Sequence, residues 1–241
     1  MTGSARHGLL DRGEASSTPV GRSGFQRRAD ELAEARSRRD LNDDQWFSGM
    51  AAIFSEAYVA GDNPRSQSGV GGDEARWEAG RRPIVEAIDR DGTFLDVGCA
   101  NGYLMESVVR WTDHQLEPYG LALAPTVAEL ARRQRPRWAS RIFVGNALTW
   151  QPPMRFDFVR AELVYVPEQR QGAFLRRLLS QIVAPGGRLI LCGYGSPRSG
   201  QSPHPVRWLT RLHGLEPELE FDREAPEGGG PIIEVAVLRA A

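Results

Sequence analysis

The stretch FLDVGCANG, residues 94–102, joins an apolar run to one acidic residue and a cluster of small residues. Asp96 stands two residues ahead of Gly98, and Gly102 precedes a helix-favouring segment. Small residues let a backbone turn sharply and approach a ligand closely. A carboxylate at the entrance of such a loop repels phosphates and attracts an ammonium or sulfonium group. The stretch therefore predicts a loop that binds a cationic nucleoside.

Two phosphate-binding motifs that could occupy such a loop are absent. The dinucleotide fingerprint requires G-x-G-x-x-G, whereas residues 98–102 read G-C-A-N-G. The other motif ends in Lys-Ser or Lys-Thr, and all 30 basic residues of this chain are arginine. A nucleoside that carries positive charge in place of phosphate fits best, and S-adenosyl-L-methionine is such a ligand.

Strand-like and helix-like segments alternate around this loop. The strand-like runs are residues 93–99, 117–123, 141–147, 156–166 and 187–195. Helix-like segments cover residues 74–89, 103–111, 125–134, 168–183 and 205–213. Residues 218–221 and 232–238 predict a closing hairpin. This alternation predicts a mainly parallel sheet with helices on both faces. Ligands of such sheets bind beyond the carboxyl ends of the strands, where the loop falls.

The N-terminal part predicts a tail and a helical cap before the main domain. Residues 1–24 lack periodicity, so we expect a disordered tail there. We expect residues 25–73 to form the helical cap and residues 74–241 to form the main domain. Apolar residues recur at helical spacing after Asp43 and Asp44: Trp46, Met50, Ile53 and Phe54. This helix either covers the core or closes over a ligand, and the sequence leaves both interpretations open.

Composition restricts the classes of partner. The net charge of −1 offers no basic field for a nucleic acid. No apolar stretch approaches the ~20 residues of a membrane helix, and we expect cytoplasmic residence. Two cysteines and four histidines without clustering predict neither a disulfide framework nor a bound metal.

Four motifs in order carry a family resemblance: FLDVGCANG, YGLALAP, FVGNALTWQPPMRFDFV and LLSQIVAPGGRLIL. Over roughly residues 75–240 the chain resembles the class I S-adenosylmethionine-dependent methyltransferases. The resemblance implies an α/β, Rossmann-like, seven-stranded and mostly parallel sheet of order 3-2-1-4-5-7-6, with the last strand antiparallel. That order separates Cys99 from Cys192 by about 9–10 Å, so we expect both to be reduced.

The resemblance also implies the cofactor contacts. Those with the methionine part fall on Asp96, Gly98, Cys99, Ala100, Asn101 and Gly102. Asn146 takes the place of an acid that binds the adenine amino group; its amide oxygen can still accept, with Ala147 and Leu148 flanking the ring. A simple turn asparagine is the alternative.

Ala122, followed by Leu123, stands where the family has an acid that grips both ribose hydroxyls. Each lost hydrogen bond to a charged acceptor costs roughly 1.5–3 kcal/mol. We therefore expect weaker cofactor binding than is typical of the family.

Acceptor chemistry is expected at the end of the fourth strand. Glu162 is the candidate base or acceptor-orienting group, with a further cofactor contact, unless it is a solvated loop acid. We expect Tyr165 to form part of the pocket wall, and His204 is a second candidate base. His213 ends a helix, where it can answer the helix dipole.

The cap supplies further candidates. Trp46, Phe54 and Tyr58 can close the pocket, and Arg65 or Arg76 can hold the cofactor carboxylate or lie at the surface.

Three functions follow from these residues. The first is methyl transfer to O, N or C of a small bacterial metabolite or natural-product intermediate, with no nucleic acid or membrane partner. Ala122 motivates the second, a methyltransferase-like enzyme that catalyses cyclisation or rearrangement. The third is a non-catalytic binding subunit. Whether the chain forms a homodimer stays open.

Overall fold

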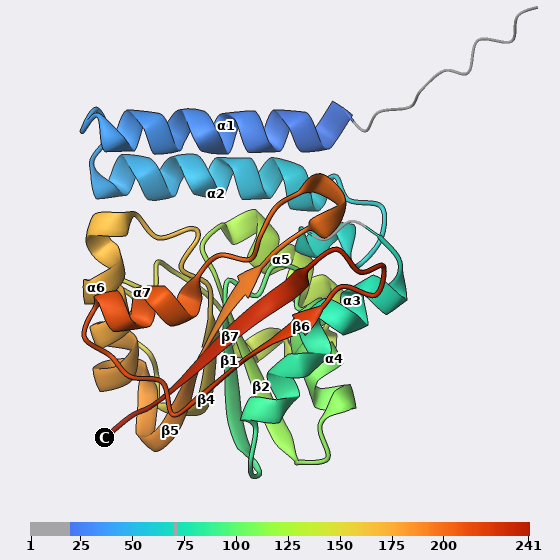
Figure 1. Cartoon of the computed structure of the whole chain (residues 1–241), viewed down its shortest axis with the longest axis vertical. Helices are drawn as coiled ribbons and strands as arrows, with labels where there is room; N and C mark the ends of the chain where they lie inside the picture. Colours follow the sequence, from blue (N-terminus) through green and yellow to red (C-terminus); the bar gives the residue numbers. More distant parts are fainter. Residues whose placement is uncertain (1–19, 70–71) are drawn as a thin grey trace, which may run out of the picture.

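The computed structural model describes residues 20–69 and 72–241, and side chains from residue 27 onward. Seven strands form one sheet in the order β3-β2-β1-β4-β5-β7-β6 (Figure 1). Their bounds are β1 Gly92–Val97, β2 Leu116–Ala122, β3 Ile142–Val144, β4 Phe156–Ala161, β5 Val183–Tyr194, β6 Leu219–Glu224 and β7 Pro231–Arg239. Pairing is parallel from β3 through β5, and β7 runs antiparallel to both of its neighbours. The predicted strand order and closing hairpin are confirmed.

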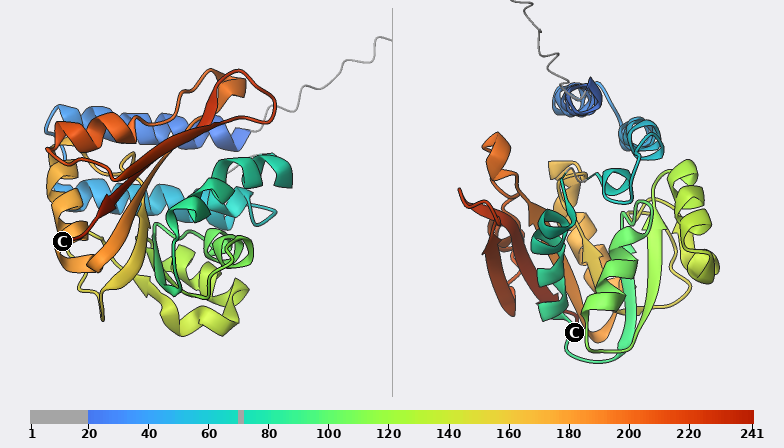
Figure 2. Two further views of the ribbon diagram at one scale, coloured as in Figure 1. Left: turned by 60° about the horizontal axis from the view of Figure 1, so that its bottom comes forward. Right: turned by 90° about the vertical axis from the view of Figure 1, so that its right-hand side faces the viewer.

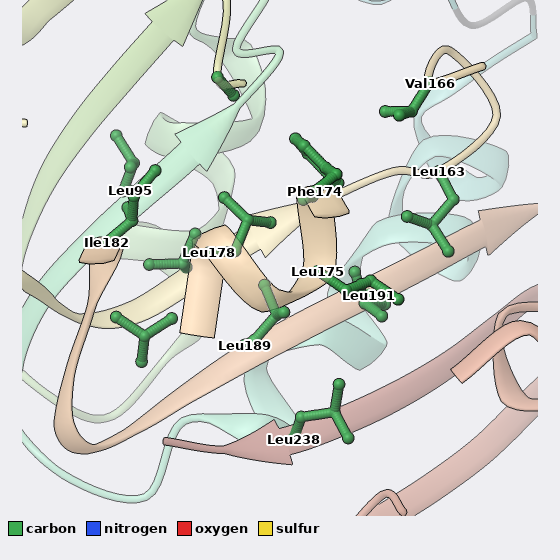
Figure 3. Packing of buried hydrophobic residues seen from close by; sticks show 14 of the residues in the cluster. Leu95, Leu163, Val166, Phe174, Leu175, Leu178, Ile182, Leu189, Leu191 and Leu238 are labelled. Atoms are coloured by element: carbon green, nitrogen blue, oxygen red, sulfur yellow. The ribbon is translucent and has the colours of Figure 1, made fainter. Parts of the chain in front are cut away.

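Helices cover both faces of this sheet. One face carries α3 (Glu74–Arg81), the 3-10 turn η2 (Arg82–Ala87) and α4 (Tyr103–Trp111), with α5 (Pro125–Gln134) and the 3-10 turn η3 (Pro136–Arg141) toward the β3 edge. The other face carries α6 (Glu168–Arg177), the π turn η4 (Leu178–Ile182) and α7 (Val206–Leu212). Figure 3 shows Leu175 and Leu178 packed against Leu189 and Leu191 of β5. The core thus lies on both sides of the central strands.

Two predicted helices are shorter than their sequence patterns suggested. The segment 74–89 is helical only as far as Arg81, because Pro83 follows and the chain tightens into η2. The segment 168–183 ends as an α-helix at Arg177 and continues as η4 before β5 begins. Neither change alters the sheet.

The cap consists of α1 (Val20–Ser37), α2 (Asp43–Val59) and the short 3-10 turn η1 (Ser66–Ser68). Asn42 starts α2 with a capping box in which Asn42 and Gln45 exchange hydrogen bonds. The predicted tail, residues 1–24, overlaps α1 from Val20 onward, and residues 1–19 lie outside the described part.

The inner face of α2 lies across the carboxyl ends of the strands, and α1 packs outside it (Figure 2). Trp46, Met50 and Ile53 are buried there against Leu123 and Tyr165, which follow β2 and β4. The indole Nε1 of Trp46 donates to the carbonyl of Tyr165 at 3.3 Å. Among the residues that the structure describes, no helix is long and apolar enough to cross a membrane.

Candidate functional site

The backbone of the glycine loop bends through three left-handed residues between β1 and α4. Gly98, Ala100 and Gly102 have φ of +85°, +47° and +76°. A Cβ added at Gly98 would meet no atom within 4 Å, so this residue opens onto free space beside the strand end. Ala100 is the one non-glycine of the three and therefore bears the strain of that conformation.

A buried ionic cluster lies directly beneath the loop. Asp96 of β1 and Arg160 of β4 are 1% and 2% exposed and sit opposite each other in the parallel register. Arg160 Nη1 donates to Asp96 at 3.1 Å, while Nη2 donates to Glu162 and, at 2.9 Å, to the hydroxyl of Tyr194. One guanidinium therefore joins the two carboxylates of the predicted site.

The electrostatics of this cluster follow from burial and pairing. Burial raises the pKa of Asp96, and Arg160 opposes that rise. Burial also opposes the charge of Arg160, yet Tyr194, Glu162 and Asp96 together raise its pKa well above the ordinary value. Arg160 is thus a permanent cation, and its guanidinium is shared by two carboxylates.

A narrow apolar cavity of about 90 Å³ adjoins the loop, between the strand ends and α2. The loop contributes Gly98, and the segments after β2 and β3 contribute Leu123 and Asn146. Phe47, Met50 and Phe54 of α2 close it from above. A wider open groove of about 870 Å³ shares Phe47, Leu123, Asn146 and Leu148 with this cavity and leads to solvent.

About half of the predicted cofactor contacts line this cavity: Gly98, Leu123, Asn146, Ala147, Leu148 and Glu162. The Asn146 amide oxygen accepts from the backbone N–H of Leu148 at 3.0 Å. It is therefore a turn asparagine, and one lone pair of that oxygen remains for a second donor.

The other predicted contacts have structural partners away from the cavity. Cys99 packs with Ala122, Met105 and Trp138 beneath α5, and both Cys99 and Cys192 are free thiols. Ala122 is 2% exposed within that cluster, and Gly102 is the N-cap of α4. Sequence reasoning placed Ala122 at the ribose, whereas in the structure the neighbouring Leu123 lines the cavity.

Asn101 joins the loop to the cap. Its side chain is fully buried, accepts from Ser68 Oγ at 2.5 Å and donates to the Pro64 carbonyl at 3.0 Å. It also accepts from the backbone N–H of Tyr103 and donates to Gln134. The residue therefore fixes the cap to the loop in this structure.

The two cap arginines proposed for a carboxylate are both engaged. Arg65 pairs with Glu74 at 2.9 Å, and Arg76 pairs with Glu227. Arg81 lies over the ring of Tyr194, with its Cζ 3.4 Å from the centroid. No carboxylate among the described residues lies within ion-pair distance of Arg81. It is the cation next to the cluster that is left for an anionic group.

Aromatic residues of α2 and of the segment after β4 pack beside the cavity. Tyr165 meets Phe54 edge to face at 5.0 Å between centroids, and Phe54 stacks on Tyr58 at 5.4 Å. The hydroxyls of Tyr58 and Tyr165 are hydrogen-bonded. Burial, with Glu162 adding to it, raises the pKa of Tyr58 to about 12, so this phenol is neutral at ordinary pH.

The two histidines differ in their surroundings. His204 follows β5, and burial lowers its pKa while Glu162 opposes the change. In His204 and His213 alike, Nε2 is buried without a hydrogen-bond partner among the described residues. His213 is the C-cap residue of α7, next to Gly172 of α6, a structural position.

Sequence reasoning missed Arg160, Tyr194, Arg81, Phe47 and the cavity role of Met50. One signal was readable. Arg160 stands inside the apolar run FDFVRA and two residues before Glu162, and an arginine in a central strand needs buried anionic partners.

Comparisons with known proteins find similarity at the level of structure. No family model and no curated protein matches the sequence. A Burkholderia thailandensis 1,6-didemethyltoxoflavin N1-methyltransferase, solved with its substrate and S-adenosylhomocysteine, is 16% identical with a TM-score of 0.57. The match covers 83% of this chain and 91% of that one.

Two further solved structures are similar. Geranyl diphosphate C-methyltransferase from Streptomyces coelicolor is 14% identical with a TM-score of 0.52, over 83% of this chain and 100% of that one. A Haloferax volcanii chain from a complex of the Trm112 methyltransferase activator with a methyltransferase is 14% identical with a TM-score of 0.55, over 78% and 97%. The chain has the fold of the class I S-adenosylmethionine-dependent methyltransferases.

Proposed function

We propose that this protein transfers a methyl group from S-adenosylmethionine to a small-molecule acceptor. The observation that carries the proposal is the buried cluster under the glycine loop. Asp96 and Glu162 place two carboxylates beneath the loop, and Arg160 pairs with both. An ammonium or sulfonium at the loop would be attracted by these carboxylates, whereas a pyrophosphate would be repelled by them. Two of the structurally similar methyltransferases were solved with S-adenosylhomocysteine.

The residues present fit the parts of this cofactor. Leu123, Ala147 and Leu148 offer apolar walls for the adenine ring, and Arg81 can hold the carboxylate. Ala122 is buried beneath α5 and offers the ribose no acceptor, while Asp43 and Asp44 line the adjoining groove with Leu123 and Asn146. The cavity of about 90 Å³ is well below the ~300–1,000 Å³ of ordinary ligand pockets. The groove of about 870 Å³ beside it is not lined by Gly98 or Glu162, so a cofactor seated against the glycine loop requires α2 to move outward.

Bound S-adenosylmethionine would supply the electrophilic methyl group. The chain's own part is to position a nucleophile, exclude water and accept a proton where one must leave. Glu162 lies at the end of β4, between the cavity and Arg160, and can orient the acceptor. Tyr58, Tyr165 and Phe54 close the site from the cap, and His204 is a neutral base candidate beside it.

Titration calorimetry with S-adenosylmethionine and S-adenosylhomocysteine tests the proposal. We expect both nucleosides to bind to the wild type and NAD not to bind. In the Asp96→Asn variant the affinity for S-adenosylmethionine should fall at least tenfold, about 1.4 kcal/mol. Asp157→Asn is the matched control, because Asp157 caps the opposite end of β4 by accepting from Thr93. No binding by the wild type up to about 1 mM, a free energy of only about −4 kcal/mol, would exclude the proposal.

A second function, cyclisation or rearrangement without methyl transfer, is favoured by Ala122. Alanine at this position lacks the side chain with which the resembled family holds the ribose, so the site is open to chemistry other than methyl transfer. Product mass separates the two: a product heavier than the acceptor by one methyl group supports transfer, and an isomer of unchanged mass supports rearrangement. A chain that binds the cofactor and converts no acceptor would be a binding subunit.

A further inference from the structure

Arg160 is a buried arginine in a central strand of the sheet. It lies between Asp96 of β1 and Ile190 of β5 in the register. Its two Nη atoms reach Asp96, Glu162 and Tyr194, and its Nε is buried without a partner. The side chain is thus held almost entirely by the two acids and one phenol.

A role in packing alone does not account for this arrangement. Ion pairs at such depth contribute little net stability, because desolvation of the charges offsets their attraction. An apolar side chain would fill the same space at lower cost, as Phe158 and Val159 do in the same strand. The charge of Arg160 therefore acts on the protonation and orientation of the side chains that it contacts.

We propose that Arg160 is a positioning residue of the cofactor site, which keeps the Asp96 carboxylate charged and orients it, together with Glu162, toward one cationic group. The inference rests on the function proposed above and goes beyond it. Without the guanidinium, two carboxylates would share one buried region, and at least one of them would take up a proton. A protonated Asp96 attracts an ammonium or sulfonium far less.

The groups that face Asp96 define the expected pH dependence. They are Arg160 on β4, Glu162 directly after β4, Arg81 on α3, and Cys99 in the loop. Burial raises the pKa of the Cys99 thiol. Burial also raises the pKa of Tyr194, which contacts Arg160. Neither group ionises near neutral pH. A change in cofactor affinity with pH in that range therefore reflects protonation of the carboxylates.

The experiment is calorimetric titration of S-adenosylmethionine and S-adenosylhomocysteine into the full chain between about pH 5.5 and 8.5. In Arg160→Met we expect the pH of half-maximal affinity to rise by about one unit or more relative to the wild type, the usual effect of an arginine on a neighbouring acid. The affinity of this variant for S-adenosylmethionine at the lowest pH should be at least tenfold weaker than at the highest pH. Arg160→Lys keeps the charge and should restore most of the wild-type profile.

Arg160→Met combined with Asp96→Asn is the control, because it removes the titrating acid and should bind weakly at every pH. If Arg160→Met does not fold, Arg160→Gln keeps a hydrogen-bonding side chain without charge and carries the same expectation. A uniform loss of affinity, with the wild-type pH profile unchanged in the charge-free variant, would overturn the inference. Failure of the wild type to bind either nucleoside at any pH would instead overturn the proposed function.

Discussion

At the scale of the residue, Ala100 shows how closely the loop backbone constrains its sequence. Its φ of +47° lies in the left-handed region, which costs a residue with a Cβ about 1–2 kcal/mol. Glycine removes that strain but is more flexible in the unfolded chain. The loop therefore tolerates alanine there with a small loss of stability.

We expect Ala100→Gly to raise the free energy of unfolding by about 0.5–1 kcal/mol. Gly102→Ala is the opposite control: its added Cβ would make only ordinary contacts, the nearest at 3.7 Å, so backbone strain alone should destabilise the protein by about 1 kcal/mol. Urea denaturation measures both variants. An Ala100→Gly variant less stable than the wild type would contradict this account of the loop.

His204 gives a pH dependence of stability with a defined sign. Burial lowers its pKa in the folded protein, so below about pH 6.5, its ordinary value, the unfolded chain binds the additional proton. Stability should therefore fall as the pH falls through that region and be fully present above it. His204→Gln should flatten this part of the profile, as measured by urea denaturation at pH 5.5 and 7.5. An unchanged slope in the variant would show that His204 is as accessible to protons as in the unfolded chain.

At the scale of the element, α2 decides access to the site. Its apolar face lies on the strand ends, and Ser55 Oγ of α2 lies 2.6 Å from Thr126 Oγ1 of α5. Asn101 ties the connection after α2 to the glycine loop. These contacts hold the cap in the position that leaves the cavity narrow.

A disulfide across Ser55 and Thr126 should lock the cap. In the double variant S55C/T126C the new thiols lie close enough to bond, and the native Cys99 and Cys192 are buried. We expect the oxidised chain to bind S-adenosylmethionine at least tenfold more slowly than the same chain after reduction, because α2 can no longer move outward. Stopped-flow tryptophan fluorescence measures the rate, and the S55C variant alone is the control. Equal rates in the oxidised and reduced chains would show that the cofactor reaches the site without movement of α2.

At the scale of the whole molecule, the site joins distant parts of the chain. Strand ends, both connections after β2 and β3, and the cap all contribute to it. A ligand that holds these parts together must stabilise the entire fold.

Cofactor at about 100 times its dissociation constant should stabilise the folded state by about 2.7 kcal/mol. For a chain of 241 residues this corresponds to a rise in melting temperature of about 5–10 °C. Differential scanning calorimetry with and without S-adenosylmethionine measures the shift, and NAD at the same concentration should cause none. A shift with NAD alone would show that the loop accepts phosphate.

The sequence by itself was sufficient to predict the fold, and it proposed a site at the glycine loop. Alternating segments predicted a mainly parallel sheet, because local periodicity and short connections restrict the fold; the order of the strands came from the resemblance to a known family. Local patterns also predicted the glycine loop at the strand ends and identified α2 from its apolar spacing, whereas the resemblance suggested Asn146 and Leu148 as neighbours of the cofactor.

Only the tertiary structure decided which side chains meet there. Asp96 and Arg160 are 64 residues apart, and their pairing depends on β1 and β4 lying side by side in one register. The burial of Ala122 beneath α5, the tie of Asn101 to the cap and the narrow cavity under α2 likewise arise from packing between segments remote in sequence. Such contacts follow from the three-dimensional fit of whole elements, which no local pattern of residues encodes.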